Sequence, residues 1–111
     1  MKTDKELIGA STSILVLGIL AKDPSYGYEV VKRVNQEAEN LFEWQEGTIY
    51  PVLHKLEKEG LLRTEWQEAN TGRRRKYYYI TDQGREALHS QSAQWQSFNS
   101  LLHRVVEMPH G

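Results

Sequence analysis

The chain has 111 residues, of which 39% are hydrophobic and 26% are charged, and its formal net charge at pH 7 is −1. These proportions are typical of one soluble globular domain, and the length is too short for two separate cores. The absence of cysteine excludes disulfides and thiolate metal sites. The near-neutral charge does not indicate a nucleic-acid binder, so such a function would have to rest on local clusters of basic residues.

The N-terminal residues carry acids among their bases, and no small-residue cleavage site follows the apolar run, so we predict no signal peptide. The longest apolar run, residues 14–21, is far shorter than the roughly 20 residues that cross a bilayer. We therefore expect a cytoplasmic protein that does not contact a membrane.

The first predicted helix covers residues 5–21, and its second half is apolar in nearly every direction. A domain of this size has little interior to surround such a helix, so part of its surface is expected to meet a second subunit. Asp23 or Ser25 is expected to cap a second helix over residues 26–38. Gly27 would allow another helix to approach closely, and residues 41–44 alternate like a very short strand.

A third helix is predicted between Gly47 and Gly60, with one apolar stripe formed by Ile49, Val52, Leu53 and Leu56. Pro51 is expected in the first turn, so the helix should begin near Gly47 or Thr48, and Gly60 should end it as a left-handed cap. Its opposite side is hydrogen-bonding, basic or flat, and comprises Thr48, Tyr50, Pro51, His54, Lys55 and Lys58. Such a helix suits the major groove of DNA, although a solvated surface helix is an equally good interpretation of this pattern alone.

Two strands are predicted next, over residues 62–67 and 76–81, joined by a turn-rich loop over residues 68–75. The loop ends in a basic run, and the residues expected at DNA from this hairpin are Gly72, Arg73, Arg74, Arg75 and Lys76. By itself an arginine run is more often a solvated loop. Directly after a helix-turn-helix pattern it indicates a wing that contacts phosphates. For Tyr78 we expect packing within the sheet instead.

The last predicted helix begins at Thr81 or Asp82 and carries a heptad pattern. The residues spaced by seven are Leu88, Trp95 and Leu102 in one row, and Phe98 and Val105 in a second. This seam predicts a dimer interface, with packing inside the same chain as the alternative. The order of elements predicts a mainly α fold with a small β-hairpin: a winged helix-turn-helix over residues 1–81 and a dimerisation helix over residues 82–111, in one compact unit.

Three segments of the chain resemble the PadR family of bacterial transcriptional regulators in their order and spacing. The segments are Tyr26-Gly27-Tyr28-Glu29, the stretch from Gly47 to Leu61, and the stretch from Gly72 to Tyr78 with Ile80-Thr81 and Gly84. The length resembles the short subgroup of this family, which has a single C-terminal helix. The resemblance implies a homodimeric repressor that binds operator DNA and is often released by a small molecule.

Trp95 lies in the middle of the seam, where a two-fold axis would bring it near its counterpart. Multidrug-binding members of the short subgroup have a tryptophan at the matching place, which implies a planar apolar or cationic ligand stacked between two indoles. The other expected lining residues are Ile14, Leu15, Phe98 and Asn99, with Glu6 at the mouth. The chain departs from those members at Asn99, where an acid would favour cations. In the alternative, Trp95 only fills the dimer core.

An enzyme is not expected. The four histidines have no metal-like spacing with carboxylates, and neither a nucleophile elbow nor a phosphate-binding glycine loop is present. We therefore predict neither a metal nor a cofactor. The remaining alternative is a winged helix that contacts only proteins and does not respond to a ligand.

Overall fold

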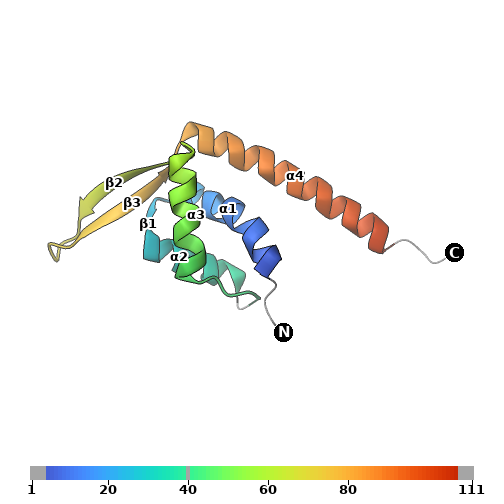
Figure 1. The fold of residues 1–111 in the computed structure, drawn as a ribbon, viewed down its shortest axis with the longest axis horizontal. Coiled ribbons are helices and arrows are strands. Elements are labelled where there is room, and N and C mark those ends of the chain that lie inside the picture. The colour runs from blue at the N-terminus through green and yellow to red at the C-terminus, as the bar shows by residue number, and fades with distance from the viewer. Residues whose placement is uncertain (1–4, 40, 108–111) are drawn as a thin grey trace.

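The structure is a computed structural model that describes residues 5–39 and 41–107. Its elements in chain order are α1 (Lys5–Lys22), β1 (Ser25–Tyr26), α2 (Gly27–Ala38), α3 (Glu46–Lys58), β2 (Leu62–Glu68), β3 (Arg74–Ile80) and α4 (Asp82–Val106). Three helices pack together, while the β2–β3 hairpin and α4 extend in opposite directions (Figure 1). The mainly α class is confirmed, with the two-residue β1 as an additional strand.

The hydrophobic core lies between α1, α2 and α3, and the root of the hairpin closes it. α1 is central because Val16 and Leu17 are fully buried, which agrees with its apolar sequence. The expected stripe of α3 is also confirmed, since Ile49, Leu53 and Leu56 are all buried. The other buried apolar residues are Ile19, Leu20, Val30, Val31, Val34, Trp44, Leu62 and Tyr78.

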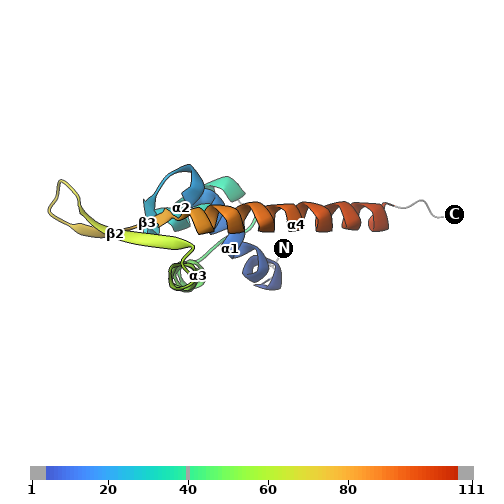
Figure 2. The ribbon, with the colours of Figure 1, turned by 90° about the horizontal axis from the view of Figure 1, so that it is seen from above.

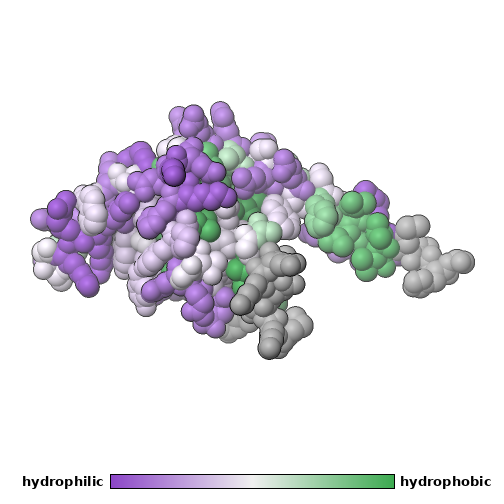
Figure 3. Space-filling model, viewed as in Figure 1, coloured by the Kyte–Doolittle hydropathy of each residue, from purple (hydrophilic) through white to green (hydrophobic). Residues whose placement is uncertain are grey.

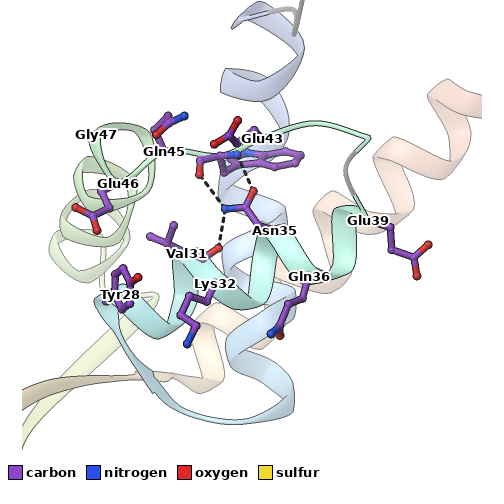
Figure 4. A pocket seen from close by; sticks show the side chains of 11 residues that line it. Tyr28, Val31, Lys32, Asn35, Gln36, Glu39, Glu43, Gln45, Glu46 and Gly47 are labelled. Carbon is purple, nitrogen blue, oxygen red and sulfur yellow. Dashed lines mark hydrogen bonds between the residues drawn. The ribbon is translucent and has the colours of Figure 1, made fainter. Parts of the chain in front are cut away.

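The segment between α2 and α3 is not the strand expected at residues 41–44. Side-chain hydrogen bonds hold it in place of a strand partner. The amide of Asn35 donates to the carbonyl of Trp44 over 2.9 Å and accepts from its N–H over 2.8 Å. Figure 4 shows this amide between α2 and the connecting segment. The Trp44 indole N–H donates to Thr12 of α1 over 3.1 Å, so the start of α3 is fixed to both helices.

The predicted cap of α2 is wrong. Tyr26 precedes this helix and its side chain makes no capping hydrogen bond. Ser25 instead lies in β1 and accepts a hydrogen bond from Arg33. The same guanidinium donates to the carbonyls of Ile19 and Asp23 over 2.8 Å each. Ile19 lies in the last turn of α1 and Asp23 directly follows the helix, so Arg33 binds carbonyls at the C-terminal end of α1.

The sheet has the strand order β1-β3-β2, and both pairings are antiparallel. β2 and β3 pair from Leu62 opposite Ile80 to Glu68 opposite Arg74. The loop is therefore shorter than expected, because Arg74 and Arg75 belong to β3 and only Arg73 lies in the turn. Ladder hydrogen bonds extend the strands further than their composition indicated.

α3 begins at Glu46, after Gln45, so Pro51 lies in the second turn and not in the first. The expected end is confirmed, since Gly60 has a φ of +80°. Its N–H donates to Glu57 over 3.0 Å and the N–H of Leu61 donates to Leu56 over 2.9 Å, which is the Schellman pattern.

α4 is capped by Thr81, one of the two predicted caps, whose hydroxyl accepts from the N–H of Gly84 over 3.0 Å. Its first half lies along α1, and its second half projects beyond the packed helices in both ribbon views (Figures 1 and 2). The projecting half has a continuous hydrophobic surface (Figure 3). Its exposed large apolar residues are Phe98, Leu101, Leu102, Val105 and Val106.

Candidate nucleic-acid interface

One groove, about 610 Å³ in volume, lies where α3, the start of α2 and the outer part of β3 meet. It is lined by Tyr26, Gly27, Tyr28, Tyr50, His54, Arg73, Arg75, Lys76 and Tyr78. The groove thus combines two polar residues of the expected recognition helix with three basic residues of the hairpin. Cations, phenols and an imidazole in one concave surface form hydrogen bonds and ion pairs with a phosphate backbone or with base edges.

Gly27 and Tyr50 set the shape of the groove floor. A Cβ built on Gly27 would lie 2.7 Å from Cε1 of Tyr50, so the ring can rest there only because residue 27 is glycine. The close approach expected at Gly27 is therefore made by a side chain of α3. Burial, together with the charge of Glu46, raises the pKa of Tyr50. The phenol stays neutral at pH 7 and keeps its proton for donation.

The three arginines do not form one cluster. Arg73 lies in the turn, and the alternation of β3 directs Arg74 and Arg75 to opposite faces. The guanidinium of Arg75 lies 4.3 Å from the ring centre of Tyr26. That of Arg74 lies 5.4 Å from the ring centre of Trp66. Among the three, Arg73 and Arg75 line the groove and Arg74 does not.

Lys76 is held by Glu57, a residue that the sequence analysis did not single out. Its ammonium lies 3.1 Å from Oε1 of Glu57, and the Thr64 hydroxyl donates to Oε2 over 3.0 Å. Burial opposes ionisation of Glu57, but the hydrogen bonds from Lys76 and Thr64 outweigh it and lower the pKa of the carboxyl. The only sequence signal was an acid one turn after His54, on the basic side of α3.

The remaining residues expected at DNA lie on the surface of α3 and at the hairpin tip. Lys55, Lys58 and Pro51 are exposed, and Thr48 is half-buried. Gly72 has a φ of +79° and forms the turn, where its N–H donates to the carbonyl of Ala69 over 2.9 Å. None of these residues is among those that line the groove.

The residues expected to bind a ligand fall into two separate hollows of the single chain. Trp95 and Phe98 share one hollow with Ala10, Ser13, Gln91 and Gln94. Their rings meet edge to face, with centres 6.3 Å apart. Ile14 and Leu15 line a different, apolar hollow with Leu41 and Phe42. Asn99 is exposed, and the side chain of Glu6 lies outside the described part of the chain.

The hollow drawn in Figure 4 lies between α2 and the start of α3. Its charged lining residues are Lys32, Glu39, Glu43 and Glu46. Among the described residues, no group of three or more histidine, aspartate or glutamate side chains is placed to hold a metal ion. Within the same residues, no helix is both long and apolar enough to span a membrane.

Solved structures similar to this one include transcriptional regulators. A PadR family regulator from Eggerthella lenta is 34% identical, with a TM-score of 0.79 over 94% of this chain and 88% of that one. A PadR-like regulator from Bacillus cereus is 27% identical, with a TM-score of 0.81 over 95% of this chain and 100% of the other. The winged-helix architecture predicted from the order of elements agrees with these neighbours.

Sequence relatives lead to the same family. An uncharacterized protein of Lysinibacillus sphaericus is 31% identical over 89% of this chain and 90% of its own length. The negative transcriptional regulator PadR of Bacillus subtilis is 31% identical over 67% of this chain, which spans only 41% of that protein. Residues 16–90 match the description "Transcriptional regulator PadR-like family". The chain therefore belongs to the PadR-like family of transcriptional regulators.

Proposed function

We propose that the protein is a sequence-specific DNA-binding repressor that acts as a homodimer. The observation that supports this most is the groove in which Tyr50 and His54 of α3 meet Arg73, Arg75 and Lys76 of the hairpin. Repression in particular is taken from the Bacillus subtilis relative, whose name describes a negative regulator. As a regulator of transcription it would act in the cytoplasm, and we assign it no catalytic activity.

Within the interface, the basic side chains would bind phosphates and the α3 side chains would read bases. Lys55, Lys58, Arg73 and Arg75 supply charge, which determines affinity and position but not sequence preference. Thr48, Tyr50 and His54 have donors and acceptors that fit base edges in the major groove. Residues 1–81 would thus form the DNA-binding part, and residues 82–111 the assembly part.

The dimer would form through α4. Its projecting half exposes Leu102 by 43% and Val105 by 62%, and the single chain offers no core to cover them. α1 carries the apolar hollow of Ile14, Leu15 and Phe42, which would accept such side chains from a second copy. A two-fold axis would place two α3 helices in successive major grooves, about 34 Å apart, on a palindromic site.

An effector would bind beside Trp95. The half-buried indole, the Phe98 ring and the neutral side chains of Ser13, Gln91 and Gln94 line a hollow between α1 and α4. A flat molecule stacked on the indole would alter how α4 packs in the dimer, and thereby the spacing of the two wings. Linkage then requires that ligand and DNA change each other's affinity by the same factor.

Selection from a pool of random duplexes tests DNA recognition without knowledge of the operator. We expect the wild-type protein to enrich a palindrome that it binds at least about a thousandfold more tightly than random DNA. A protein-interaction module that does not bind DNA would enrich no sequence, and it would not shift random DNA in a gel.

Fluorescence titration tests the effector site with a panel of planar neutral and cationic dyes. Binding should quench the fluorescence of Trp95. Trp44 and Trp66 also emit, so Trp95→Ala is the control, and in this variant the quenching should be lost. If the quenching is the same in Trp95→Ala, or if none of the panel binds with a Kd below about 100 µM, which corresponds to a binding free energy of about −5.5 kcal/mol, the ligand site is not at Trp95.

A further inference from the structure

The carboxylate of Glu57 is paired with Lys76, one of the cations that line the proposed DNA-binding groove. Glu57 follows His54 by three residues, one turn further along α3. Its nearest cation is Lys76, which lines the groove at an Oε1–Nζ distance of 3.1 Å. An acid in this position repels phosphate, so for DNA affinity alone it is unfavourable.

The same carboxylate joins α3 to both strands of the hairpin. Oε2 accepts from Thr64 in β2 and Oε1 accepts from Lys76 in β3. Thr64 and Lys76 lie on one face of the sheet, since Thr64 is paired with Tyr78 and Lys76 with Trp66. The side chains of Glu57 and Lys76 are 33% and 30% exposed, so water screens the pair less than a fully exposed one.

We infer that Glu57 is a positioning residue for DNA recognition, which fixes the hairpin against α3 and keeps Lys76 from free contact with phosphate. This inference rests on the proposed DNA-binding function. A restrained Lys76 lowers the electrostatic affinity that is equal for all sequences. A fixed hairpin preserves the geometry needed for base contacts. Together the two effects raise the ratio of specific to random binding.

The test compares Glu57→Gln with wild type on two duplexes: the sequence enriched by the wild-type protein and a random sequence of equal length. Glu57→Gln should bind the random duplex more tightly at low salt and lower the specific-to-random ratio. One freed phosphate contact per subunit should steepen the log–log salt slope by about 1.8 for the dimer. The loss of affinity between about 50 mM and about 200 mM salt should thus grow about tenfold.

Glu59→Gln is the matched control, because it removes the same charge two residues later, at the C-cap of α3, where Glu59 has no ion-pair partner among the described residues. Adding Lys76→Met completes a double-mutant cycle. If Glu57 acts by restraining Lys76, Glu57→Gln should no longer steepen the salt slope in the Lys76→Met background. Thr64→Val removes the second hydrogen bond and should lower the ratio without changing the slope.

Three outcomes would overturn the inference. One is equal behaviour of Glu57→Gln and Glu59→Gln on both duplexes. Another is a proportional loss of affinity for both duplexes with an unchanged slope, as a merely structural role would give. The third is a steeper slope that persists with Lys76→Met. A failed proposed function is distinguishable, because then the wild-type protein itself would enrich no duplex.

Discussion

The two ends of the molecule use their apolar residues differently. In the helices α1 to α3 most of the large apolar side chains are buried by the chain itself, as Leu17, Ile49 and Leu53 are. In the second half of α4 the large apolar side chains are exposed, from Phe98 to Val106. The winged helix therefore has a core within one chain, whereas the second half of α4 has apolar side chains that no described part of the chain covers. This contrast predicts different consequences for substitutions in the two regions.

The largest effect is expected for substitutions at the exposed apolar side chains in the second half of α4. Leu102→Asp would place a charge in the proposed dimer seam, which is costly without a partner charge, and should leave the protein monomeric at micromolar concentration. Sedimentation velocity measures this. Ser100→Asp adds the same charge on an exposed position off the seam and should remain dimeric. An intact Leu102→Asp dimer would show that α4 is not the interface.

The next effect belongs to the packed region. Leu53→Ala opens a cavity under α3 and should lower the free energy of unfolding by about 2–5 kcal/mol in urea titrations. The folded variant should still sediment as wild type. Val105→Ala removes methyl groups from an exposed site. It should weaken assembly of the dimer and leave the fold of the single chain unchanged. If both variants behaved alike, the contrast between the two regions would fail.

The DNA-facing surface of the packed region should respond in affinity alone. Arg73→Ala combined with Arg75→Ala should flatten the log–log salt slope by up to about 3.6, for two phosphate contacts in each of two subunits. Arg63→Ala removes one positive charge, from a side chain already paired with Glu65 over 2.8 Å, and should change the slope little. A gel-shift series over several salt concentrations measures this slope. An unchanged slope in the double variant would show that the wing does not contact the DNA.

Base reading should show a smaller and sequence-dependent effect. His54→Ala or Thr48→Ala should change the preference between operator variants by about 1–3 kcal/mol per lost base contact. Lys55→Ala should weaken all duplexes by one factor. Competition binding with single-base operator variants separates the two patterns. Uniform weakening by the first pair would mean that those residues only position the protein.

The smallest effect is the pH dependence that Glu57 gives to stability. Its folded pKa is below its usual value, so its contribution is present above the unfolded pKa of 4.5 and is lost as pH falls through the lower folded pKa. For a pair this exposed we expect about 0.5 kcal/mol at pH 7. Urea titrations of wild type and Glu57→Gln at pH 7 and pH 3 should therefore converge at the acidic pH. If the difference in free energy of unfolding between the two proteins is the same at both pH values, the effect comes from packing and not from the charge of Glu57.

Local patterns in the sequence determined much of the fold. The apolar stripe of α3, its end at Gly60 and the start of α4 at Thr81 follow from helical spacing and capping, which involve only neighbouring residues. The same is true of the heptad seam, because a helix places residues seven apart on one face whatever surrounds it. The polar face of α3 and the basic hairpin were likewise visible as local runs.

Contacts between distant segments decided the rest. β1 exists because Ser25 and Tyr26 meet Tyr78 and Tyr77, and Arg74 joined β3 because Glu68 lies opposite it. No local pattern could pair Glu57 with Lys76, which is 19 residues further along the chain. Their distance depends on how the hairpin folds back over α3. Pairings across the chain need the assembled core. The sequence therefore predicted the parts of the proposed DNA-binding surface, and only the tertiary structure decided which of them share one groove.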